Sequence, residues 1–176
     1  MILEQVLPFG ERGGCILSLR ILLVEDYEPF RRFICSTLGK RPELQVVGEA
    51  SDGLEAVHKA EELQPDLIVL DIGLPTLNGV EAARRIRKLS PKSKILFVSQ
   101  ESSADVVQEA LCLGALGYVA KTHAGSELLA AVEAVCQGRR FVGAGLASHV
   151  PAELASMGAP KRPHPDDLAS QPEVGD

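Results

Sequence analysis

Carboxylate side chains follow two short apolar runs in this sequence of 176 residues. Glu25 and Asp26 come directly after Ile21–Val24, and Asp71 comes directly after Leu67–Leu70. Carboxylates that lie close together repel one another, so such a cluster needs a compensating cation. Oxygen ligands favour a hard ion. We therefore predict a Mg²⁺ site with Asp26 and Asp71 as direct ligands, and Mn²⁺ as the expected substitute.

A hydroxyl and an amine complete this set of polar residues. Ser99 follows the run Ile95–Val98, and Lys121 follows Leu116–Ala120. Mg²⁺ binds one or two carboxylates together with a phosphate oxygen, which leaves Asp71 free to act as a nucleophile toward a phosphoryl group. Transfer of that group depends on positioning and charge neutralisation, which an ammonium and a hydroxyl supply. The residues therefore predict phosphoryl transfer to Asp71.

The positions of these side chains depend on five buried strands. Short apolar runs, most of them rich in Val, Ile and Leu, are typical of strands that are covered on both faces. They are Ile21–Val24, Gln45–Glu49, Leu67–Leu70, Ile95–Val98 and Leu116–Ala120. Between them, apolar residues recur at helical spacing, as in Phe30, Phe33, Ile34 and Leu38. Capping pairs predict helix starts at Asp52, Asn78 and Ser102.

Alternation of strands and helices over residues 20–138 predicts one doubly wound α/β domain with a parallel sheet. The carboxyl ends of parallel strands share one edge of the sheet, where ligands bind in such folds. The polar residues that end the strands should therefore meet there.

Composition excludes several classes of function. The net charge is −6 and no Lys/Arg-rich run exists, so binding of nucleic acid through a basic patch is not expected. We find neither a secretory leader nor an apolar run of the roughly 18 residues that a membrane span needs. The four cysteines show no CxxC spacing. We expect a cytoplasmic protein that does not bind membranes.

The acidic pair, Ser99, Lys121 and the segment 71–79 (DIGLPTLNG) together resemble the response regulator receiver family of two-component systems. The likeness covers residues 20–137 and is greatest to the NarL/LuxR-type subgroup, whose members usually carry a C-terminal DNA-binding helix-turn-helix. It implies a flavodoxin-like (βα)5 fold with five parallel strands in the order 2-1-3-4-5.

The resemblance also implies a role for each acidic residue. Asp71 would be the phospho-acceptor and a magnesium ligand. Asp26 would bind the metal directly and Glu25 through a water molecule. The backbone carbonyl of Gly73 would be the remaining protein ligand.

On the other side of the site, the resemblance implies that Ser99 and Lys121 bind the phosphoryl oxygens. Ser99 and Tyr118 would form a switch that repacks the face of helix four, strand five and helix five. Two positions depart from the family pattern. Thr122 follows the lysine where many receivers have a proline after a cis peptide bond, and the long Gln100 follows Ser99, where it can overhang the site.

By this resemblance the chain is not an enzyme but catalyses only its own phosphorylation and dephosphorylation. Its partners would be a histidine kinase or histidine phosphotransfer protein, a downstream protein and a second copy of the chain. A phosphorelay intermediate and a phosphorylation-independent adaptor of the same fold are the alternatives. A haloacid-dehalogenase-like phosphatase is disfavoured because Gly73 replaces its second Asp, and a dinucleotide-binding module because no GxGxxG follows the first strand.

The flanking segments carry fewer signals. We expect an irregular arm over residues 1–19, a linker or short helix over 139–150, and a polar, disordered tail over 151–176. The tail has five prolines and few large apolar residues, which is too little to form a helix-turn-helix. The expectation is therefore a receiver without a DNA-binding domain of its own.

Overall fold

The computed structural model describes residues 18–150 and residue 152. Most of the predicted N-terminal arm and of the predicted tail lies outside the described residues. None of the described helices is long and apolar enough to cross a membrane. The elements, in chain order, are β1 (Leu19–Val24), α1 (Glu28–Leu38), β2 (Leu44–Ala50), α2 (Gly53–Leu63), β3 (Leu67–Leu70), α3 (Gly79–Leu89), β4 (Lys94–Ser99), α4 (Ala104–Cys112), β5 (Gly117–Ala120), η1 (Lys121–His123), α5 (Ala124–Cys136), β6 (Phe141–Val142) and η2 (Ala144–His149).

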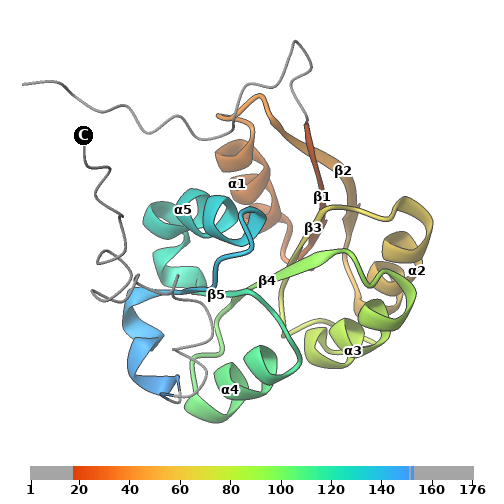
Figure 1. The fold of residues 1–176 in the computed structure, drawn as a ribbon. Coiled ribbons are helices and arrows are strands. Elements are labelled where there is room, and N and C mark those ends of the chain that lie inside the picture. Colours follow the sequence, from red (N-terminus) through yellow and green to blue (C-terminus); the bar gives the residue numbers. More distant parts are fainter. Residues whose placement is uncertain (1–17, 151, 153–176) are drawn as a thin grey trace, which may run out of the picture.

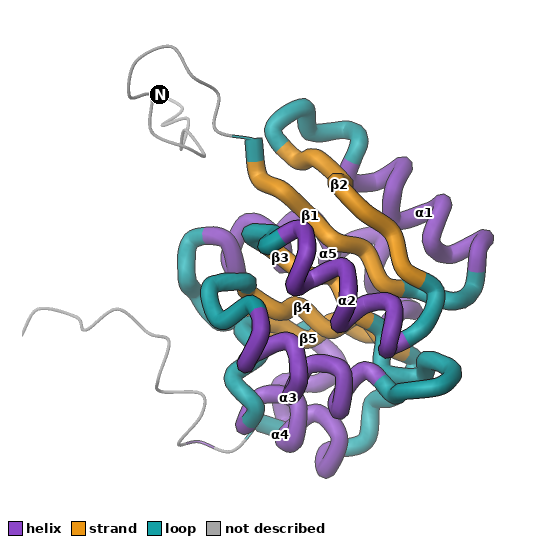
Figure 2. The backbone as a smooth tube through the Cα atoms, turned by 90° about the vertical axis from the view of Figure 1, so that its right-hand side faces the viewer, coloured by secondary structure: helices purple, strands orange, loops and turns teal. Residues whose placement is uncertain are grey.

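The strands form one parallel sheet in the order β2-β1-β3-β4-β5-β6. The predicted order is confirmed, and a sixth strand that the sequence did not predict extends the sheet beyond β5. Helices α1 and α5 cover one face, and α2, α3 and α4 cover the other (Figures 1 and 2). This is the predicted doubly wound α/β architecture.

Side chains of β1 show how the sheet is buried on both faces. Ile21 and Leu23 pack in the cluster under α1 and α5, whereas Leu22 and Val24 pack in the cluster under α2 and α3. Successive side chains of a strand point to opposite faces, so a strand between two helical layers must be apolar throughout. The continuous apolar runs in the sequence have this cause.

Two of the three predicted helix caps are confirmed. Asp52 and Asn78 each accept a hydrogen bond, at 2.9 Å, from the backbone N–H three residues further on. The prediction at Ser102 is wrong. Helix α4 begins one residue later, with Ser103 as N-cap and no side-chain capping bond. Ser102 and Ser103 can both serve as an N-cap, so the sequence pattern does not distinguish between two neighbouring starting positions for this helix.

The apolar stripe of α1 is narrower than predicted. Ile34 and Leu38 are buried and Phe30 is half-buried, but Phe33 is 40% exposed. Positions i, i+4 and i+8 lie along one face of a helix, and Phe33 falls beside that line. It stacks on Phe30 at 5.6 Å between ring centroids, so two aromatic rings lie at the margin of the domain rather than in its core.

Candidate functional site

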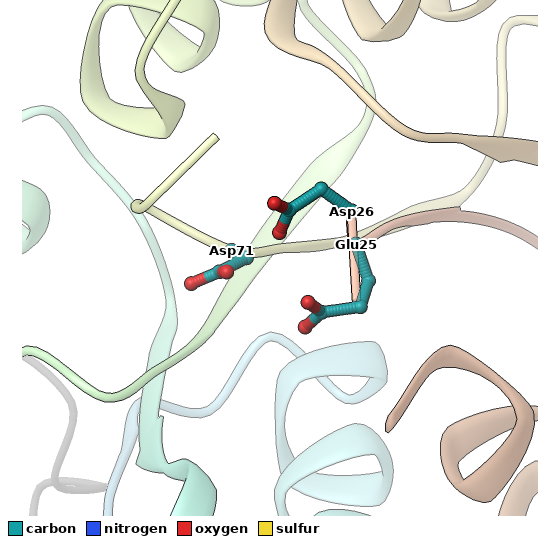
Figure 3. Close-up of side chains that lie close together, drawn as sticks. All are labelled: Glu25, Asp26 and Asp71. Carbon is teal, nitrogen blue, oxygen red and sulfur yellow. The ribbon is translucent and has the colours of Figure 1, made fainter. Parts of the chain in front are cut away.

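Neighbouring strands bring the three acidic residues together. β1 pairs with β3 so that Val24 lies opposite Leu70, and the next residues along the chain are Glu25 and Asp71. Together with Asp26, they place carboxylate oxygens within 4.8 Å of one another (Figure 3). The predicted cluster of acidic side chains therefore exists at the carboxyl edge of the sheet.

Asp71 is held in place on both sides of its carboxylate. It is 5% exposed. Its Oδ1 accepts hydrogen bonds from the backbone N–H groups of Ile72 at 2.7 Å and Gly73 at 3.3 Å. Its Oδ2 lies 2.9 Å from the Lys121 Nζ. Backbone donors and an ammonium thus orient a nearly buried carboxylate.

Lys121 joins the two buried carboxylates. Its Nζ lies 2.7 Å from the Glu25 Oε2 as well as near Asp71. Burial lowers the pKa of Lys121, but the contacts with Glu25 and Asp71 outweigh burial and raise that pKa above its ordinary value. The ammonium also lies 4.9 Å from the centroid of the Phe30 ring, a cation–π contact. The amine is therefore held as a cation at this position.

The acidic residues fit a divalent cation. Three carboxylates and one ammonium leave a formal charge of −2, which an ion such as Mg²⁺ would neutralise. Burial raises the pKa of Glu25, although the contacts with Lys121 and the backbone of Tyr27 oppose the rise. Within the described part of the chain the buried Glu25 Oε2 has no hydrogen-bond partner beyond its ion pair. Asp26 is exposed, so a hydrated ion can reach the cluster.

A pocket of about 590 Å³ opens over these residues. Five of the seven residues predicted to take part line it, namely Asp26, Asp71, Gly73, Ser99 and Lys121, whereas Glu25 and Tyr118 do not. Gln100 lines it too. No cis peptide bond occurs among the described residues, so the bond between Lys121 and Thr122 is trans.

Residues 21–133 match the family model described as the response regulator receiver domain. The chain belongs to this family. The match runs from within β1 to within α5 and includes every residue that lines the pocket. Receivers act in two-component signalling, and this domain has the acidic cluster, hydroxyl and lysine at the edge of its sheet.

Known receivers include proteins of several kinds. The transcriptional regulatory protein LiaR of Bacillus subtilis is 33% identical over 146 residues, which are 83% of this chain and 69% of LiaR. The DNA-binding transcriptional activator DevR/DosR of Mycobacterium tuberculosis is 38% identical over 70% of this chain and 57% of its own length. A protein-glutamate methylesterase/protein-glutamine glutaminase of Thermotoga maritima is 42% identical, over only 31% of its length. The likeness is thus to part of each relative.

Solved structures agree with this membership. A LuxR-family two-component response regulator from Aurantimonas sp. superposes with a TM-score of 0.73 at 34% identity, covering 78% of this chain and 99% of that one. The response regulator domain of Thermotoga maritima CheB has a TM-score of 0.64 at 36% identity, covering 68% and 97%. The likeness to LuxR-type regulators was predicted and is confirmed.

Ser99 and Tyr118 are linked through the loop after β4. Ser99 Oγ accepts a hydrogen bond from the Glu101 N–H at 3.2 Å, and the Tyr118 hydroxyl donates to the Glu101 carbonyl at 2.6 Å. The Tyr118 ring is fully buried, 6.0 Å from the ring of Phe97. Burial raises the pKa of Tyr118 to about 12, although hydrogen bonding with Ser99 opposes the rise. The receiver thus has a short path from its pocket to an aromatic residue of β5.

Two residues of the site were not singled out in the sequence. Phe30 was assigned only to an apolar helix face, yet it contacts the Lys121 ammonium. Glu101 lies two residues after the predicted switch serine, and its backbone connects Ser99 with Tyr118. No spacing signal predicts these contacts, because Phe30 and Lys121 come from distant segments, as do Glu101 and Tyr118, and Glu101 takes part only through its backbone atoms.

Gly79 allows the loop after Asp71 to close against α3. A Cβ at this position would lie 1.9 Å from the Asp71 carbonyl oxygen and 2.8 Å from the Ile72 Cα. We expect Gly79→Ala to lower the free energy of unfolding by about 1–3 kcal/mol, because backbone atoms must shift. We also expect it to slow phosphorylation of Asp71. Urea denaturation and the rate of phosphorylation by acetyl phosphate measure both effects.

The matched control is Gly125→Ala, in which the added methyl meets only the Phe33 ring edge at 3.8 Å. Alanine favours a helix over glycine by roughly 0.5–1 kcal/mol, so this variant should be as stable as the parent or more so. Equal stability of the two variants would show that the approach of Gly79 to Asp71 is not under steric constraint.

Proposed function

We propose that this receiver accepts a phosphoryl group on Asp71 from a histidine kinase or a small phosphodonor, and that it catalyses only this phosphorylation and the later hydrolysis of the aspartyl phosphate. Ser99 and Tyr118 would then change the face formed by α4, β5 and α5 for a downstream protein or a second copy of the chain. The observation that carries the proposal is the Asp71 carboxylate, held between two backbone amides and Lys121 at the floor of an open pocket.

Each side chain has a distinct task in the proposed reaction. An Asp71 carboxylate oxygen attacks phosphorus while the bond from phosphorus to the donor breaks, and the donor leaves with that electron pair. Lys121, already adjacent to Asp71, neutralises charge on the phosphoryl oxygens as the carboxylate is consumed. Ser99 donates a hydrogen bond from its hydroxyl to a phosphoryl oxygen. In dephosphorylation, water attacks the phosphorus and the bond from phosphorus to the Asp71 oxygen breaks, which releases inorganic phosphate and restores the carboxylate.

Asp26, Asp71 and the Gly73 carbonyl would hold Mg²⁺, with Glu25 acting through water. The bound ion would neutralise charge on the group in transfer. Two observations support this assignment: the negative charge of the three grouped carboxylates, and the buried Glu25 Oε2, which has no hydrogen-bond partner beyond its ion pair among the described residues. Without metal, the ion pairs of Lys121 with Glu25 and Asp71 offset part of the negative charge of the cluster, so the three carboxylates can lie close together in the folded domain.

The test is the intact mass of the protein after incubation with acetyl phosphate and Mg²⁺. We expect a gain of one phosphoryl group, its absence when EDTA replaces Mg²⁺, and its loss on treatment with hydroxylamine, which cleaves acyl phosphates. A protein that gains no phosphoryl group from acetyl phosphate or from a panel of histidine kinases would instead favour the phosphorylation-independent adaptor.

A further inference from the structure

The chain after α5 returns to the sheet and occupies the surface between α4 and α5. β6 pairs in parallel with β5, with Phe141 opposite Gly117 and Val142 opposite Tyr118. The next element, η2, lies against α4. In Figure 1 this blue segment runs beside β5 between the two helices. We refer to residues 141–150 as the return segment.

The backbone of the return segment forms hydrogen bonds with β5, α5 and α4. The Gly143 N–H donates to the Tyr118 carbonyl at 2.9 Å. The Ala144 N–H donates to the Glu127 carboxylate of α5 at 3.0 Å. On the other side, the Gln108 side-chain amide of α4 donates to a carbonyl at the end of η2 at 3.3 Å. The return segment is therefore docked on the domain through hydrogen bonds to β5, α5 and α4.

Apolar residues of the return segment pack in or against the core cluster that contains the switch tyrosine. Leu146 is 2% exposed and belongs to the same core cluster as Tyr118, and Val142 and Val150 pack against that cluster. The Tyr118 ring is 0% exposed. The return segment thus lies beside β5 and α4 at this cluster, so we expect an outward rotation of the ring to displace it.

We propose that the return segment is a ligand of this domain's own switch surface, and that its docking is coupled to phosphorylation of Asp71 through Ser99 and Tyr118. The proposal rests on the proposed function. The docked segment, the buried Tyr118 and a Ser99 that faces the phosphorylation pocket coexist in one structure. Ser99 is joined to the buried Tyr118 through the Glu101 backbone, and Tyr118 to the return segment through β6. We therefore expect a phosphoryl group that binds Ser99 to hold Tyr118 inside and so to strengthen docking.

Coupling of this kind is reciprocal, so it can be measured from both ends. We expect beryllofluoride with Mg²⁺, a mimic of the phosphoryl group, to slow hydrogen exchange of the Phe141 and Gly143 amides by about fivefold or more. We expect Leu146→Ala to weaken beryllofluoride binding by the same factor. NMR spectroscopy measures the exchange, and a titration monitored by the same spectra gives the affinity.

Leu146 is buried in the core, so its truncation can also destabilise the domain. Two further variants test the coupling without this effect. Gln108→Ala removes one hydrogen bond to the return segment and should weaken beryllofluoride binding in the same direction. Leu89→Ala, at an exposed position of α3, should leave the affinity unchanged. The exchange measurement itself needs only the parent protein.

The outcomes separate the coupling from the proposed function. Failure of the parent protein to bind beryllofluoride or to take up a phosphoryl group would overturn the proposed function. If the protein binds beryllofluoride, but the Phe141 and Gly143 amides exchange at the same rate or faster and Leu146→Ala binds as tightly as the parent, only the coupling is wrong.

Discussion

Asp71→Asn is expected to abolish phosphorylation of this receiver by acetyl phosphate. An amide oxygen is a far weaker nucleophile than a carboxylate, and no other carboxylate of the cluster occupies its place against Lys121 and the two backbone amides. Asn is close to Asp in size, so the fold should persist. Intact mass after incubation with acetyl phosphate and Mg²⁺ measures the loss.

The matched control for Asp71→Asn is Asp52→Asn. Asp52 caps α2, and Asn is as good a helix cap as Asp, so this variant should fold and take up one phosphoryl group like the parent. Circular dichroism spectra of the two variants should be the same. Stable phosphorylation of Asp71→Asn would assign the acceptor to another residue and would remove the basis of the proposed reaction.

The second large effect is expected from Lys121→Met. Without the ammonium, Glu25 and Asp71 are left as neighbouring carboxylates that are 1% and 5% exposed. Removal of one partner from a buried ion pair leaves uncompensated charge, so we expect the metal-free protein to lose on the order of 3 kcal/mol in free energy of unfolding at neutral pH. Urea denaturation in the presence of EDTA measures the loss.

Two comparisons show whether charge causes this loss. Lys59→Met removes an ammonium from a half-exposed pair with Glu55 and should cost less than about 1 kcal/mol. Addition of Mg²⁺ should recover part of the stability of Lys121→Met, because the cation neutralises the same carboxylates. A loss that is the same with and without Mg²⁺ would indicate packing of the lysine stem as the cause.

The difference in free energy of unfolding between the parent and Lys121→Met should depend on pH, and the sign of that dependence can be derived. The folded state raises the pKa of Lys121 above its ordinary value of 10.5. The stability that the ammonium contributes is therefore fully present below pH 10.5 and is lost as pH rises through the folded-state pKa. The difference in stability between the parent and Lys121→Met should shrink at higher pH, whereas a difference due to packing alone would not.

Much of the fold and the candidate site could be predicted from sequence patterns. Apolar runs marked the strands and capping pairs marked two helix starts. The strands carry polar residues at their carboxyl ends, and parallel strands share that edge. These features are local or follow from strand direction, so a linear pattern contains them. The strand order came from the family likeness, and no single run of residues specifies it.

Tertiary structure alone decided which side chains touch across the domain. Phe30 and Phe33 both belong to one apolar pattern, but only Phe30 lies over Lys121, because the turn into η1 brings the lysine to that side of α1. The burial of Tyr118 depends on a return segment that follows it by more than twenty residues. Local periodicity determines which residues are apolar and which elements form. The contacts between distant elements depend on packing of the whole sheet with its helices. The contact of Lys121 with Phe30 and the surroundings of Tyr118 are therefore decided only by the folded domain.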